Sequence, residues 1–233
     1  MQSRQVSVAA GDGGQFNAYV SLPPTGTGPG LLLIQEIFGV NQHIRDVADQ
    51  YAMDGFVVLA PDVFWRQSPG VDLGYDEAGF QKGFALMQGM DFAKAEQDLC
   101  AAAKALRQLP EVKGGIASLG FCMGGFLSYV VASNPGVVDA AVCYYGGGIQ
   151  NALDRAPSVK APILMHFAEQ DGYIPMEAVG QIKQAFASNS KASIHTYPGV
   201  DHGFNCWGRP MYQQQAAALA RGRTLQFLAS ALG

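Results

Sequence analysis

Short apolar runs alternate with longer stretches of helical periodicity along most of this chain. The apolar runs have the length of strands and few polar positions, which is typical of parallel strands that are covered on both faces. These predicted strands are residues 31–34, 56–60, 115–121, 139–145, 162–167 and 193–197.

Between the apolar runs, apolar side chains recur at the three- and four-residue spacing of an α-helix. Ile44, Val47, Ala48 and Tyr51 share one such face. Alternating strands and helices predict an α/β fold, with a mostly parallel central sheet and helices on both faces. The predicted helices are residues 44–53, 93–109, 179–186 and 212–228.

Two segments within the first ninety residues, 6–20 and 64–90, depart from this pattern. Residues 6–8 and 16–20 flank the glycine-rich stretch 11–14, which predicts a hairpin that forms an antiparallel edge of the sheet. Residues 64–90 contain Pro69 and several glycines around two short helical fragments, and we interpret them as a cap-like insertion. Because no repeat or linker divides the chain, we expect a single domain over residues 1–233.

Composition and residue spacing argue against nucleic acid, membranes and metal ions as partners. Hydrophobic residues make up 48% of the chain and charged residues 15%, with a net charge of −4, and there is no basic stripe that nucleic acid would need. The N-terminus lacks a long apolar segment, so we expect no membrane contact and a cytoplasmic location. We also expect a monomer or weak homodimer. The spacing of cysteines and histidines matches no metal motif, so we predict no metal and four free thiols.

The stretch Gly120-Phe121-Cys122-Met123-Gly124 lies between a predicted strand and the apolar, helix-like residues 126–132. Glycines at both ends allow a sharp turn that lifts the central side chain clear of the sheet. The N-terminus of the following helix favours a thiolate at Cys122. A nucleophile is one interpretation of this cysteine, and an inert buried thiol is the other.

Polar groups after three other predicted strands decide between these interpretations. Asp171, His202 and Glu36 each follow a strand, and functional groups of an open α/β sheet gather at the carboxyl ends of its strands. Taken singly, Asp171 could belong to a turn, His202 to an exposed loop and Glu36 to the surface. Cys122, Asp171 and His202 follow the chain order nucleophile, acid, histidine, and with Glu36 at a third strand end the set favours catalysis.

Several segments of the chain match those of one known family. They are Gln35-Glu36-Ile37-Phe38-Gly39-Val40-Asn41, Ala60-Pro61-Asp62, Gly120-Phe121-Cys122-Met123-Gly124-Gly125, Tyr144-Tyr145-Gly146, Asp171 and His202-Gly203-Phe204. With these segments the sequence resembles the dienelactone hydrolase family over nearly its whole length. The resemblance implies an α/β-hydrolase fold, a Cys122–His202–Asp171 triad, no cofactor, and hydrolysis of a lactone or similar ester. It also implies that Glu36 helps to deprotonate the cysteine when substrate arrives.

The resemblance fails where the family holds its substrate's carboxylate with two arginines. The matching positions are Phe80 and Cys206, and a tyrosine of the family's pocket corresponds to Phe84. A phenylalanine or a thiol cannot replace a bidentate arginine, and neither Lys82 nor Arg209 is at a matching position. We therefore expect a less anionic substrate, in a pocket that includes Phe38, Phe80, Phe84, Tyr144, Phe204 and Cys206.

We expect Cys122 to attack an ester or lactone carbonyl, while the backbone N–H groups of Met123 and Ile37 hold the oxyanion. The resulting thioester is then hydrolysed. Four alternatives remain at this point: dienelactone hydrolysis itself (carboxymethylenebutenolidase activity), acyl transfer to another acceptor, phosphotriester hydrolysis, and non-catalytic binding of a small hydrophobic ligand.

Overall fold

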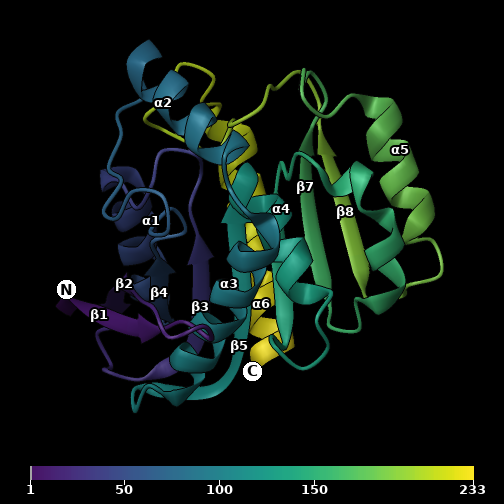
Figure 1. Cartoon of the computed structure of the whole chain (residues 1–233). Helices are drawn as coiled ribbons and strands as arrows, with labels where there is room; N and C mark the ends of the chain where they lie inside the picture. The colour runs from purple at the N-terminus through teal and green to yellow at the C-terminus, as the bar shows by residue number, and fades with distance from the viewer. Residues whose placement is uncertain (1) are drawn as a thin grey trace. The chain divides into compact units, whose positions relative to one another are not determined.

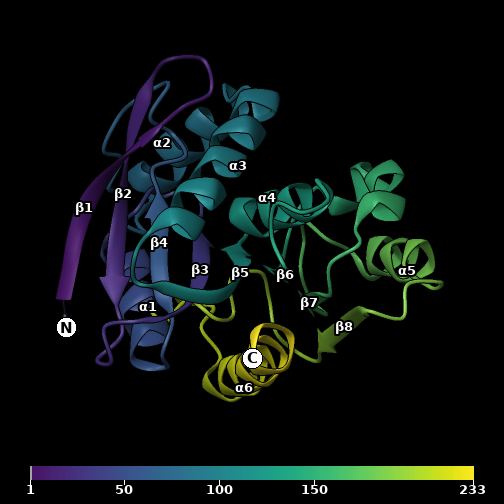
Figure 2. The ribbon, with the colours of Figure 1, turned by 90° about the horizontal axis from the view of Figure 1, so that it is seen from below.

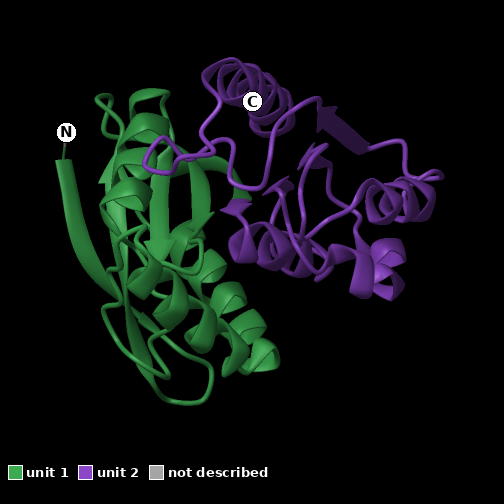
Figure 3. Ribbon diagram, turned by 90° about the horizontal axis from the view of Figure 1, so that it is seen from above, with its two compact units in different colours: residues 1–118 green, residues 119–233 purple. Residues whose placement is uncertain are grey.

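The computed structural model describes residues 2–233, and its helices and strands are labelled in Figure 1. The chain forms two compact units, Met1–Ser118 and Leu119–Gly233, which Figure 3 shows in different colours. The unit boundary falls inside strand β5 (Val112–Phe121). Strand order is β1-β2-β4-β3-β5 in the first unit and β5-β6-β7-β8 in the second.

The sheet of the first unit combines an antiparallel edge with parallel pairing. β1 (Gln2–Ala9) and β2 (Gln15–Leu22) form an antiparallel hairpin, and β2 also pairs antiparallel with β4 (Val57–Pro61). β3 (Gly28–Ile34) runs parallel to β4. The predicted N-terminal hairpin and the buried strands are therefore confirmed.

Three helices belong to this unit: α1 (Gln42–Met53), α2 (Glu77–Gln88) and α3 (Phe92–Gln108). α1 and α3 lie on opposite sides of β3 and β4, which explains why those strands are apolar on both faces (Figure 2). The prediction of two short helical fragments within residues 64–90 is wrong, because α2 is one helix of 12 residues.

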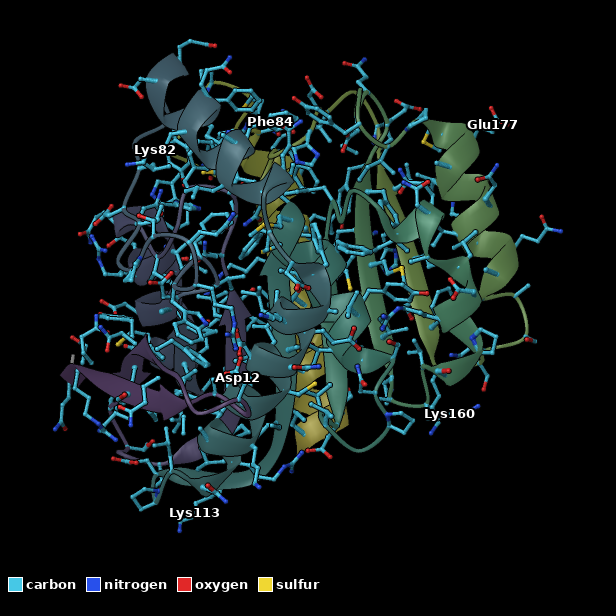
Figure 4. All side chains as sticks on the ribbon, in the orientation of Figure 1. Asp12, Lys82, Phe84, Lys113, Lys160 and Glu177 are labelled. Atoms are coloured by element: carbon cyan, nitrogen blue, oxygen red, sulfur yellow. The ribbon has the colours of Figure 1, made fainter. Side chains whose placement is uncertain are left out.

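Arg66 ties the hairpin turn to the rest of the first unit. Its guanidinium donates to Asp12 (Nη1 to Oδ2, 2.8 Å) in the turn and to Asp98 (Nε to Oδ2, 2.7 Å) on α3. Trp65 lies 4.3 Å beneath the guanidinium and donates its indole N–H to the same Asp98 carboxylate. Asp12 and α3 can be located in Figures 4 and 1. The guanidinium of Arg66 thereby joins the hairpin turn and α3 to the segment that follows β4.

Three strands of the second unit are parallel to one another. β6 (Ala140–Tyr144), β7 (Ile163–Ala168) and β8 (Ala192–Tyr197) run parallel. α4 (Met123–Ala132) and α5 (Met176–Ala185) cover one side of these strands and α6 (Gln214–Leu232) covers the other (Figure 2). Two 3₁₀ helices, Ile149–Asn151 and Leu153–Ser158, follow β6 and were not predicted.

A buried polar network connects this sheet to α6. Thr224 on α6 lies 2.7 Å from the hydroxyl of Tyr144 and 3.0 Å from His166 Nε2, and His166 Nδ1 lies 2.8 Å from the hydroxyl of Tyr197. Burial holds the pKa of His166 well below its usual value, with the charges of neighbouring groups acting in the same direction. The neutral imidazole therefore has one donor and one acceptor nitrogen for its two partners.

Within residues 2–233, no helix combines the length and the hydropathy that a membrane crossing would need.

Candidate functional site

Cys122 lies at a strained turn between β5 and α4. Its backbone has φ 56° and ψ −119°, a region that L-residues other than glycine rarely occupy. Two backbone hydrogen bonds fix the turn, from the Cys122 N–H to the Tyr144 carbonyl (3.0 Å) and from the Gly125 N–H to the Cys122 carbonyl (2.9 Å). The half-buried Cys122 is thus held at the end of the strand.

Glycine is required on both sides of this turn. A Cβ at Gly120 would lie 2.9 Å from the Gly125 nitrogen and would overlap the Gly124 carbonyl. A Cβ at Gly125 would lie 3.1 Å from the Gly146 Cα and would overlap the Tyr144 carbonyl. The glycine pattern in the sequence is therefore explained by close backbone approach rather than by flexibility.

His202 and Asp171 form a buried pair in the same unit. His202 Nδ1 lies 2.7 Å from Asp171 Oδ2, and the Asp171 side chain is 0% exposed. The other carboxylate oxygen accepts hydrogen bonds from the backbone N–H groups of Tyr173 (2.8 Å) and Ile174 (3.2 Å). Because the carboxylate accepts from several donors, it is fixed in position and orients the imidazole.

Electrostatics connect this pair to the cysteine. Burial lowers the pKa of His202, but its electrostatic interaction with Cys122 and its hydrogen bond to Asp171 outweigh burial and raise the pKa to about 10. The imidazolium form of His202 is therefore favoured. This is the form that results when the imidazole accepts a proton.

Aromatic rings surround the imidazole. The ring centroids of Tyr145 and Tyr173 lie 5.0 and 5.1 Å from that of His202, and Phe204 lies 5.5 Å from Tyr145. Tyr145 adopts φ 37°, a second strained position, and it follows Tyr144, whose carbonyl accepts from the Cys122 N–H. Neither Tyr145, within Tyr144-Tyr145-Gly146, nor Tyr173, two residues after Asp171, was predicted from the sequence as a site residue.

Two further residues expected in the pocket, Tyr144 and Cys206, are buried in this unit. The ring of Tyr144 is fully buried between Phe121 and His166, and its hydroxyl is bonded to Thr224, so this tyrosine belongs to the buried network. Cys206 is 1% exposed and accepts a hydrogen bond at its carbonyl from Arg209.

The remaining candidates lie in the first unit, after β3. Glu36 is 1% exposed, and the Tyr75 hydroxyl donates to its Oε2 at 3.2 Å. Phe38 packs edge-on against Tyr75 with ring centroids 4.6 Å apart. Tyr75 belongs to the cap-like segment, and a single tyrosine in a glycine-rich stretch gave no sequence signal.

α2 carries the other two aromatic candidates. Phe80 and Phe84 stack with centroids 5.9 Å apart. Lys82 and Phe84 leave α2 on different sides (Figure 4). Arg209, in the second unit, lies against the residue that follows His202, because a Cβ at Gly203 would be 2.7 Å from its Nη1. A cationic group therefore lies beside Gly203, at a sequence position that differs from the family's.

The sequence was compared with known proteins. The pattern of the dienelactone hydrolase family matches residues 16–232. A relative from Azospirillum brasilense is 40% identical over 98% of this chain and 99% of its own. A carboxymethylenebutenolidase of Pseudomonas putida is 35% identical over 98% of this chain and 97% of its own.

Solved structures agree with these relatives. A protein of Klebsiella pneumoniae superposes with a TM-score of 0.85 at 28% identity, covering 98% of this chain and 99% of that one. A dienelactone hydrolase-like promiscuous phosphotriesterase from metagenomic libraries shares the fold, with a TM-score of 0.82 at 22% identity over 100% of both chains. The predicted α/β-hydrolase fold is confirmed, and the chain is a member of the dienelactone hydrolase family.

Proposed function

We propose that this hydrolase cleaves carboxylic esters or lactones through a thioester on Cys122. The observation that carries the proposal is the raised pKa of His202, which has Cys122 and Asp171 as its causes, beside a cysteine in a strained turn. Perturbed titratable groups next to a nucleophile are typical of active sites.

In the first half-reaction, His202 accepts the thiol proton and the Cys122 sulfur attacks the carbonyl carbon. The tetrahedral intermediate then collapses, the C–O bond to the alcohol breaks, and His202 returns its proton to the leaving alkoxide. Water attacks the thioester in the second half-reaction, with His202 as base, and the acid leaves with regeneration of the thiol. Asp171 keeps the imidazole oriented throughout. The family resemblance assigns Glu36 to assisting deprotonation of the thiol.

The backbone N–H groups of Met123 and Ile37 are the proposed oxyanion donors. Met123 begins α4, so its N–H has no acceptor within the helix. Within residues 2–233, no protein acceptor is bonded to the Ile37 N–H. Donors that are not already engaged are suited to a charge that develops only in the transition state.

Activated esters and lactones suit this chemistry better than amides. A thiolate is a better leaving group than an amine, so the intermediate from an amide reverts to substrate. Water is the proposed acyl acceptor, and added amine or alcohol would reveal transfer to another acceptor as a second product.

The charge of the substrate separates two candidate functions. Phe80 and Cys206 stand where the family has arginines, which supports a neutral or weakly anionic substrate. The position of Arg209 beside Gly203 and the name of the Pseudomonas putida relative support dienelactone hydrolysis as the second candidate. Steady-state kinetics on dienelactone, neutral lactones and aryl esters distinguish them, with Arg209→Met expected to slow only an anionic substrate.

The test of the nucleophile uses 4-nitrophenyl acetate and a panel of lactones. Cys122→Ala and His202→Ala should abolish turnover, whereas Cys100→Ala, at a half-buried thiol in α3, should leave it unchanged. Iodoacetamide near neutral pH should label Cys122 faster than the other three cysteines. Unchanged turnover in Cys122→Ala would sink the proposal.

A further inference from the structure

Gln35 is a fully buried polar residue that follows β3 and precedes Glu36. Its Oε1 accepts a hydrogen bond from the Val63 N–H at 3.2 Å, and its Nε2 donates to the Glu36 carbonyl at 3.3 Å. The two partners fix the orientation of the side-chain amide, because an N–H must face an oxygen and a carbonyl must face a nitrogen donor. Gln35 therefore joins the end of β4 to the peptide group between Glu36 and Ile37.

That peptide group contains the proposed oxyanion donor. The carbonyl of Glu36 and the N–H of Ile37 belong to one planar trans peptide and point in opposite directions. Any rotation of the carbonyl turns the N–H by the same angle. We infer that Gln35 is a positioning residue that sets the direction of the Ile37 N–H by holding the carbonyl at the other end of its peptide; this inference rests on the proposed function.

The peptides that follow are held by other groups. The Ile37 carbonyl touches Gly83 on α2, and the Phe38 carbonyl accepts a hydrogen bond from the Leu73 N–H at 2.9 Å. Gly39 forms a bridge with Asp72. These contacts place the loop, whereas Gln35 acts on the rotation of the 36–37 peptide itself. Gln35 can be fully buried because both the oxygen and the nitrogen of its side-chain amide are hydrogen-bonded.

Loss of a complete oxyanion donor slows related reactions by about 100- to 1000-fold. A misdirected N–H keeps part of its interaction, because hydrogen bonds weaken steeply only as the angle at the hydrogen falls toward about 120°. We therefore expect removal of the Gln35 amide to lower the rate of acylation by roughly 10- to 100-fold. The interaction forms in the transition state, so kcat and kcat/KM should fall together and KM should change little.

The experiment compares two reactions of the same cysteine. Acylation by 4-nitrophenyl acetate develops an oxyanion, whereas alkylation by iodoacetamide is a direct displacement that develops none on the substrate carbonyl. Gln35→Met and the shorter Gln35→Asn should both slow acylation by at least tenfold and leave alkylation of Cys122 within about twofold of wild type. Gln81→Met, at an exposed glutamine on α2, is the matched control and should alter neither rate.

Urea unfolding shows whether each variant is folded. If Gln35→Met does not fold, the comparison of rates uses Gln35→Asn alone. Equal slowing of acylation and alkylation would overturn the inference, because it would place Gln35 in activation of the thiol or in general stability. Acylation within threefold of wild type in a folded variant would also overturn it. Failure of the proposed function is read separately, as turnover that survives Cys122→Ala in an otherwise wild-type chain.

Discussion

Replacement of Gly83 by alanine tests whether α2 supports the loop that contains Ile37. Gly83 lies inside α2, where alanine is preferred over glycine by about 1 kcal/mol. A Cβ at this position would lie 3.1 Å from the Ile37 carbonyl carbon and 3.3 Å from its Cγ1, and it would overlap the carbonyl oxygen.

The structure gives the size of the conflict. Ordinary contact begins at 3.4 Å, so the carbon alone requires a retreat of 3.4 − 3.1 = 0.3 Å, and the oxygen requires more. Overpacking of this kind costs about 1–3 kcal/mol, which exceeds or cancels the helical gain. Gly83→Ala should therefore change the free energy of unfolding by between about zero and 2 kcal/mol, in the destabilising direction.

Gly180→Ala is the matched control. Gly180 lies in the middle of α5, is exposed, and has no atom within 4 Å of the added Cβ. It should stabilise the protein by up to about 1 kcal/mol. Urea unfolding measures both variants, and 4-nitrophenyl acetate hydrolysis should slow in Gly83→Ala alone. If Gly83→Ala stabilises as much as its control and keeps full activity, the proposed support of Ile37 by α2 is refuted.

Two further predictions concern buried polar groups of the second unit. Thr224→Val removes the hydrogen-bond partner of the buried Tyr144 hydroxyl and His166 imidazole, so it should lower the free energy of unfolding in urea by about 2–5 kcal/mol. The control Thr196→Val, at a partly exposed hydroxyl, should change this free energy by less than about 0.5 kcal/mol. Equal effects of the two variants would contradict the network. Asp171→Asn should lower the pKa of His202 from about 10 in an NMR titration. The folded pKa of His202 exceeds its ordinary value of 6.5, so protonation of His202 stabilises the wild-type protein fully below pH 6.5, and this stability is lost as the pH rises to about 10. The loss should be smaller in Asp171→Asn. An unchanged titration of His202 would rule out Asp171 as a cause of the raised pKa.

The sequence supports the fold well because burial on both faces leaves a direct trace in apolar runs. β3, β4 and β7 are buried along nearly their whole length, and runs of that kind have few other interpretations. The hairpin was predictable from its glycine-rich turn, in which the Ala10 N–H donates to the Gly14 carbonyl and the Gly13 N–H donates to the Ala10 carbonyl.

The failure at α2 has a physical cause. Gly79 and Gly83 resemble helix breaks in the sequence, but each is a place where backbone from elsewhere approaches the helix, at Gly74 and at Ile37. Only tertiary structure distinguishes a glycine that interrupts a helix from one that allows close packing.

The candidate site divides in the same way. Cys122, Asp171 and His202 follow strands, so chain order and the geometry of an α/β sheet place them at one edge. Gln35 and Tyr75 gave no independent signal, because their importance comes from partners many residues away, at Val63 and at Glu36 respectively. Such partners follow from packing and leave no local pattern.

At position 122 the positive φ angle favours glycine, whereas the proposed chemistry requires a thiol. Glycine would occupy this backbone conformation without strain, so the fold gains nothing from a side chain there. In a library selected only for thermal resistance, glycine should accumulate at position 122, and under the proposed mechanism the most stable descendants would be inactive. The proposed role of Cys122 as the nucleophile would explain why a thiol is present in a backbone conformation that folding alone does not favour.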